Sequence, residues 1–167
     1  MTHLFRSSGA VSRWPQGPVG IMRFVCAVDH SEPSLQAAKF AVELAEKCGA
    51  ELTLVSVVRL PDGEQYGITE YLRSEHNPDP PGVVVLEAAQ NELALLGEQF
   101  GRAHAVAITC EVRAGEAATE IVASASNRPV DLIVMGHRSQ SRLAQALLGS
   151  VARRVLDTAP CPVLIVR

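Results

Sequence analysis

The sequence predicts a single α/β domain: a doubly wound, five-stranded parallel sheet of order 3-2-1-4-5, with helices on both faces. Short apolar runs alternate with stretches of helical periodicity, and most of the runs are apolar at nearly every position. Alternating strands and helices require parallel crossovers, and strands covered on both faces are apolar throughout. The chain of 167 residues has room for one such domain.

The first two strands and the helix between them have clear signals. Residues 23–28 (RFVCAV) are strand formers, Ser31 offers an N-cap, and Pro33 falls in the first helical turn. Apolar residues then recur at helical spacing until Gly49, which is expected to end the helix. Residues 51–58 (ELTLVSVV) predict the second strand.

The middle of the chain predicts a loop, a helix and an edge strand. Proline and glycine recur through residues 59–83, and a loop that long in a compact domain usually has a use. A helix follows and is expected to end at Gly101. Residues 106–112 alternate, with Thr109 and Glu111 on the face opposite the apolar residues. That pattern is typical of a half-exposed edge strand, so the third strand is placed outermost.

The remaining elements complete the alternation. Residues 118–125 predict a helix, 131–135 (DLIVM) a buried strand, 150–158 a helix, and 162–166 (PVLIV) the last strand. Residues 1–20 have no periodic pattern and are interpreted as a flexible N-terminal tail, which leaves 21–167 as the domain.

Composition argues against several classes of protein. The net charge of −3 gives no electrostatic reason to expect nucleic acid as a partner. No stretch approaches the ~18 apolar residues of a membrane span. Four cysteines lie far apart without a CxxC pair, which predicts free, buried thiols in a reducing cytoplasm: Cys26, Cys48, Cys110 and Cys161.

Polar residues gather where the predicted strand order reverses, between the first and fourth strands. Residues 29–31 (DHS) and 136–139 (GHRS) follow those strands directly. Ligands of open α/β sheets bind at this crevice. Gly136 and Gly149 would allow a phosphate close to the backbone, Ser150 begins a helix, and Arg138 adds positive charge. A plain glycine turn with a serine cap is the alternative interpretation.

The C-terminal block is specific enough to indicate a family. Residues 135–167, MGHRSQSRLAQALLGSVARRVLDTAPCPVLIVR, resemble the G-x2-G-x9-G-(S/T) block of universal stress proteins with their CPVLVV-like last strand. The opening VCAVDHSEPSLQAA is similar to the first strand and helix of that family. The resemblance covers residues 22–167 and implies a Rossmann-like, adenine nucleotide alpha hydrolase-like fold.

The resemblance implies an ATP site, with AMP as the alternative ligand and a divalent metal able to accompany the phosphates. Asp29 would contact the nucleoside and backbone near Val57 the adenine. Ribose and phosphates would lie on Gly136, Gly149, Ser150 and Val151, while the pocket would be lined by Ala27, Met135 and Arg138. The motif's second glycine is replaced by Ser139, whose Cβ would crowd a phosphate or whose hydroxyl would donate to one.

The role favoured by these features is a stress-response or signalling module that binds the nucleotide, with residues 59–83 as lid or partner surface. No P-loop, dinucleotide fingerprint or convincing general base occurs in the sequence. Slow ATP hydrolysis, or autophosphorylation at Ser139 or Ser150, stays open. So do a transferase or hydrolase that uses Tyr66 or Glu70, and a dimeric scaffold without ligand.

Two single residues have competing interpretations. Asp29 is either a ligand contact or a cap on the turn at Ser31, because aspartate is common in such turns. His30 and His137 end adjacent strands, where a metal or proton-transfer role is an alternative to polar contact with phosphate.

The last strand predicts a homodimer. Val163, Leu164, Ile165 and Val166 are apolar on both faces, yet the predicted order places them at a sheet edge. A bare apolar edge invites aggregation unless something covers it. Antiparallel pairing with the same strand of a second copy would cover it, as is common in the family; an arm from residues 1–20 is the alternative.

Overall fold

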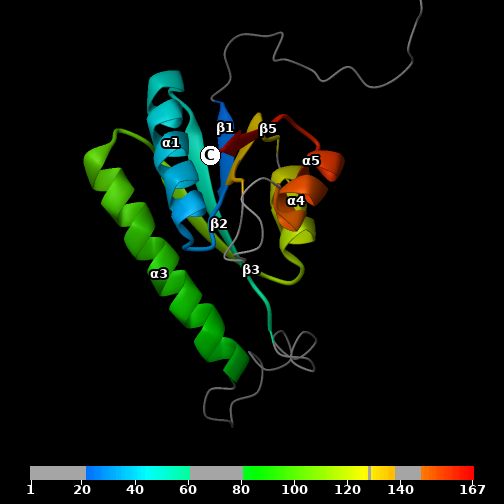
Figure 1. Ribbon diagram of the computed structural model, residues 1–167. Coiled ribbons are helices and arrows are strands. Elements are labelled where there is room, and N and C mark those ends of the chain that lie inside the picture. Colours follow the sequence, from blue (N-terminus) through cyan, green and yellow to red (C-terminus); the bar gives the residue numbers. More distant parts are fainter. Residues whose placement is uncertain (1–21, 61–80, 128, 138–147) are drawn as a thin grey trace, which may run out of the picture.

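A computed structural model describes residues 22–60, 81–127, 129–137 and 148–167. Five parallel strands form one sheet in the order β3-β2-β1-β4-β5 (Figure 1). Their bounds are Arg23–Ala27 (β1), Glu51–Val58 (β2), Ile108–Ala114 (β3), Leu132–Gly136 (β4) and Val163–Val166 (β5). The predicted strand order is confirmed.

Helices cover both faces of the sheet, as predicted (Figure 1). Helices α1 (Glu32–Cys48) and α3 (Pro81–Ala103) lie on one face, and α4 (Ala117–Ser126) and α5 (Ser150–Thr158) on the other. Successive residues of β1 alternate between the two layers: Cys26 packs against α1, whereas Val25 packs on the side of α4 and α5. The central strands are therefore apolar at nearly every position.

Local signals set both ends of α1. The Ser31 side chain accepts a hydrogen bond from the Ser34 backbone at 3.4 Å. Gly49 has φ of 61°, a left-handed conformation that glycine adopts without a steric penalty, and its N–H bonds the carbonyls of Ala45 and Glu46. Both predicted caps are confirmed.

Helix α3 is longer than expected: it begins at Pro81, inside the predicted loop of residues 59–83, and Gly101 does not end it. Position 101 is an exposed helical position, and the His104 N–H still bonds the Phe100 carbonyl at 3.0 Å. The end comes where Glu46 of α1 accepts from the Ala105 N–H and meets His104 Nδ1, both at 2.9 Å. Those bonds, led by the one to His104, lower the pKa of Glu46. A tertiary contact therefore determines this boundary.

The cysteines are free thiols, but they are not all buried. Cys26 is fully buried, and desolvation raises its pKa to about 12. Cys110 and Cys161 are half-buried, whereas Cys48, the last residue of α1, is exposed. Among the described residues no helix is both long and apolar enough to cross a bilayer. The tail at residues 1–20 lies outside the described part of the chain, as does most of the predicted loop at 59–83.

Candidate functional site

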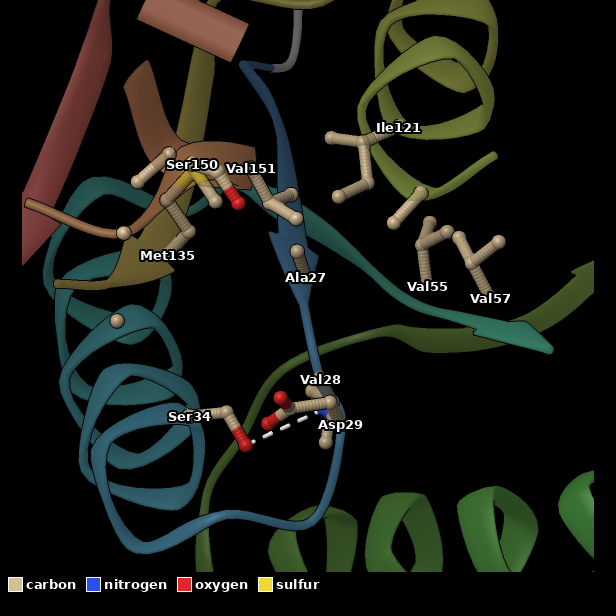
Figure 2. Close-up of a pocket in the computed structure, with 14 residues that line it drawn as sticks. Ala27, Val28, Asp29, Ser34, Val55, Val57, Ile121, Met135, Ser150 and Val151 are labelled. Carbon is tan, nitrogen blue, oxygen red and sulfur yellow. Dashed lines mark hydrogen bonds between the residues drawn. The ribbon is translucent and has the colours of Figure 1, made fainter. Parts of the chain in front are cut away.

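A hollow opens at the carboxyl ends of β1 and β4, where the strand order reverses (Figure 2). It encloses about 630 Å³ of space, part of it open to solvent. The lining residues come from three strands and from helices on both faces of the sheet: Ala27, Val28, Asp29, Ser34, Val55, Val57, Ala117, Ile121, Met135, Gly136, Gly149, Ser150, Val151 and Ala152.

Eight of the residues nominated from sequence line this hollow, from Ala27 in β1 to Val151 in α5. Arg138 and Ser139 lie outside the described residues, and so do Tyr66 and Glu70. Sequence reasoning missed Val28, Ser34, Val55, Ala117, Ile121 and Ala152. Strand alternation would have found Val55, because it lies two residues before Val57 on the same face of β2.

One end of the hollow is apolar. Val55 and Val57 of β2 form its floor beside Ala27, and Ile121 projects from α4 above them (Figure 2). Ala117 adds the small side chain at the start of α4. These walls offer dispersion contacts and few hydrogen-bonding groups, so this end suits the flat ring of a base.

Asp29 is held in a compact turn at the opposite side of the hollow. Its Oδ1 accepts hydrogen bonds from the Ser31 N–H at 3.1 Å and from the Ser31 hydroxyl. Ser34 Oγ accepts from the Asp29 N–H at 3.2 Å (Figure 2). The same hydroxyl donates to the Ser31 carbonyl at 2.9 Å. Asp29 therefore caps this turn, as one interpretation of the sequence had it, while its side chain also lines the hollow.

Gly136 is required by the fold as well as placed in the hollow. A Cβ at this position would lie 2.7 Å from both the carbonyl carbon and oxygen of Pro33, and 3.0 Å from the Ser34 nitrogen. The close approach that the sequence assigned to a phosphate is thus made here by the first turn of α1. Any larger residue would push α1 away from the end of β4.

The amino end of α5 forms another wall of the hollow. Gly149 is its N-cap and supplies no side-chain cap, while the Gly149 N–H bonds the His137 carbonyl at 2.9 Å. Residues 149–152 of this first turn line the hollow. First-turn N–H groups and the positive end of the helix dipole favour an anion at this point.

The two histidines that follow β1 and β4 have different surroundings. His30 has φ of 58°, unusual for a residue with a side chain, and its Nε2 lies 3.7 Å from Glu92 Oε2 of α3. His137 Nδ1 is buried and has no hydrogen-bond partner among the residues that the structure describes. In the same residues no group of three or more His, Cys, Asp and Glu side chains is arranged to hold a metal.

Comparison with known proteins agrees with this architecture. The model of the Universal stress protein family matches residues 20–167. This chain belongs to the universal stress protein family. A universal stress protein of Methanocaldococcus jannaschii is 36% identical over 152 residues, which cover 87% of this chain and 81% of that protein.

Solved universal stress proteins share the fold. UspA of Lactobacillus plantarum superposes with a TM-score of 0.70 at 25% identity, covering 90% of this chain and all of the other. A universal stress protein in complex with cAMP has a TM-score of 0.63 at 24% identity, covering 89% and 98% of the two chains. A universal stress protein from Archaeoglobus fulgidus in complex with dAMP has a TM-score of 0.60 at 20% identity, covering 90% of this chain and 100% of the other. These two members of the family are thus each seen in complex with an adenine nucleotide.

Proposed function

We propose that this universal stress protein binds an adenine nucleotide in the hollow, ATP first and AMP as the alternative, and acts in the cytoplasm as a stress-response or signalling module. The observation that carries the proposal is one hollow that joins an apolar slot to the first turn of a helix. A base would lie between β2 and α4, with the phosphates at the first turn of α5. The complexes of relatives with cAMP and dAMP support it.

The same hollow favours binding over turnover. Among the described residues that line it, Asp29 supplies the carboxylate. Its Oδ1 already accepts hydrogen bonds from Ser31. A divalent metal would have to be coordinated by the phosphates of the nucleotide, because the described residues contain no cluster of side chains that could serve as its ligands. The free thiols support a reducing compartment.

Titration calorimetry with ATP, AMP and adenosine tests the proposal, using two variants of Ser150. Ser150→Ala removes only the hydroxyl, whereas Ser150→Pro also removes one backbone donor at a helix position that tolerates proline. We expect Ser150→Pro to weaken ATP about tenfold or more, because hydrogen bonds to charged groups are the strong ones. Ser150→Ala should have the smaller effect.

Adenosine provides the internal control, since it has no phosphate for α5 to hold. Its affinity should be the same in wild type, Ser150→Ala and Ser150→Pro. A wild-type protein that ignores all three ligands would refute the proposal and favour a scaffold without nucleotide. Equal losses for ATP and adenosine would place the phosphates elsewhere.

We also propose that the protein is a homodimer through β5. In the described residues β5 is the sheet edge and pairs with β4 alone, and its four apolar residues, Val163 to Val166, are all partly exposed. The Pro162 carbonyl accepts from the Ile133 N–H of β4 at 3.0 Å, and the Val166 carbonyl accepts from the N–H of His137, directly after β4, at 2.9 Å. By alternation along the strand, the backbone groups of Ile165 point away from β4 and are placed to pair with a second copy.

Ile165→Pro is the matching test. Proline removes the outward N–H of an edge strand and leaves the bonds to β4 in place. We expect the variant to keep its far-ultraviolet circular dichroism and elute as a monomer where wild type elutes as a dimer, measured by light scattering. Ile165→Val keeps the N–H and should remain dimeric. An Ile165→Pro protein that is still a dimer would mean that another surface joins the copies.

A further inference from the structure

The edge strand β5 is too short to join two copies of the chain by itself. Its four residues, at ~3.3 Å each, make an edge about 13 Å long. Stable interfaces between proteins bury about 800 Å² on each partner. A dimer through β5 therefore needs further surface, and the helices on either side of the strand are the elements placed to supply it (Figure 1).

Phe40 supplies such surface in the layer of α1. It is 43% exposed. It lies seven residues after Pro33, and so on the same flank of α1, and Pro33 approaches Gly136 of β4. Glu46, about 120° away around the helix, contacts His104 at the end of α3. The flank that carries Phe40 is therefore turned away from α3 and toward the β5 edge.

Leu156 holds the matching position in the other layer. It is also 43% exposed. On α5, Arg154 pairs with Glu116 at the start of α4 at 3.3 Å, and Val151 lines the hollow. Leu156 lies about 140–160° around the helix from both of these residues. It is therefore turned away from α4, toward the β5 edge of the sheet.

The strand joins these two residues into one apolar surface. Leu164 and Val166 pack on the side of α1, and Val163 and Ile165 on the side of α4 and α5. All four residues of β5 are still partly exposed. Phe40, residues 163–166 and Leu156 thus form a continuous surface across both helical layers, here named the β5 surface.

A second copy of the chain fits the β5 surface better than an unrelated extended peptide. A single peptide strand would pair with β5 and leave Phe40 and Leu156 in water. A two-fold axis perpendicular to the sheet places α1 of both copies on one side of the joined sheet, and α5 of both copies on the other. Each helical layer then meets the same layer of the second copy, so all parts of the surface are covered together.

We infer that Phe40 and Leu156 are the anchors of the homodimer, one on each side of the sheet, where an anchor is an exposed apolar side chain that the second copy buries. The inference rests on the proposed homodimer through β5. A symmetric interface contains each anchor twice, so a single substitution removes two contacts.

Sedimentation equilibrium of Phe40→Ala and Leu156→Ala tests the inference. We expect each variant to raise the dissociation constant of the dimer about tenfold or more, because a few large side chains carry most of the affinity of an interface. The double variant should show about the product of the two factors, since the residues lie on opposite faces of the sheet. Leu95→Ala, at a residue of α3 that is 67% exposed, is the matched control and should leave the constant unchanged.

The outcomes separate this inference from the proposed homodimer. If both alanine variants keep the wild-type constant while Ile165→Pro is a monomer, the inference is overturned and the dimer through β5 stands. If wild type is a monomer at every concentration, both fail. Should the wild-type dimer be too tight to dissociate, Phe40→Glu would bury an unpaired charge and is expected to be a monomer, with Leu95→Glu still a dimer; a dimeric Phe40→Glu overturns the inference.

Discussion

Gly136→Ala is expected to lower the free energy of unfolding by about 2–3 kcal/mol, or roughly 5–10 °C in the midpoint of thermal unfolding. The added Cβ would meet backbone atoms of Pro33 at 2.7 Å, and backbone cannot rotate away as a side chain can. Either α1 or the end of β4 must move, and both line the hollow. ATP affinity should fall with stability. Thermal unfolding followed by circular dichroism checks the first effect.

Gly101→Ala is the matched control, because a Cβ there meets nothing within 4 Å and the position is helical. Alanine is the better helix former by about 0.5–1 kcal/mol, so this variant should unfold at a slightly higher temperature. If Gly136→Ala were as stable as Gly101→Ala, the tight packing of α1 against β4 would be disproved.

Ala117→Phe should abolish measurable ATP binding, with a loss of about a hundredfold or more, while the protein stays folded. Ala117 is half-buried at the start of α4 and lines the apolar slot. A benzyl group there occupies the space proposed for the base. Because the group enters an existing apolar hollow, it should cost little stability. Calorimetry with ATP and a thermal melt of the same sample measure both effects.

Ala88→Phe provides the comparison for this variant. Ala88 is an exposed residue of α3, on the opposite face of the sheet, so the same substitution should leave ATP affinity unchanged. Wild-type affinity in Ala117→Phe would show that the base does not lie between β2 and α4.

The fold was predicted well because short stretches of sequence, such as apolar runs and helix caps, determine most of its strands and helices. The apolar run of β2 has the predicted ends, and Ser31 and Gly49 cap α1 as expected. The end of α3 could not be predicted from Gly101, since Glu46 of another helix determines it. The spacing of apolar residues predicts the structure of their own segment, but it does not predict contacts between segments that are far apart in sequence.

The residues of the candidate site could likewise be predicted only where local sequence determines their position. Residues at strand ends, such as Asp29 and Gly136, were placed in the hollow because the order of the sheet brings strand ends together. Ala117 and Ile121 were missed, because their place in the hollow depends on how α4 crosses the sheet. The packing role of Gly136 was missed because its neighbour, Pro33, is far away in sequence.

The hollow takes its walls from six elements, from Ala27 near the start of the described chain to Ala152 near its end. No fragment of the domain carries the complete set, so a bound ligand is released whenever the domain opens as a whole. Ligand at a hundred times its dissociation constant then adds about 2.7 kcal/mol against opening. The concentration of the proposed nucleotide would then affect how often the domain opens.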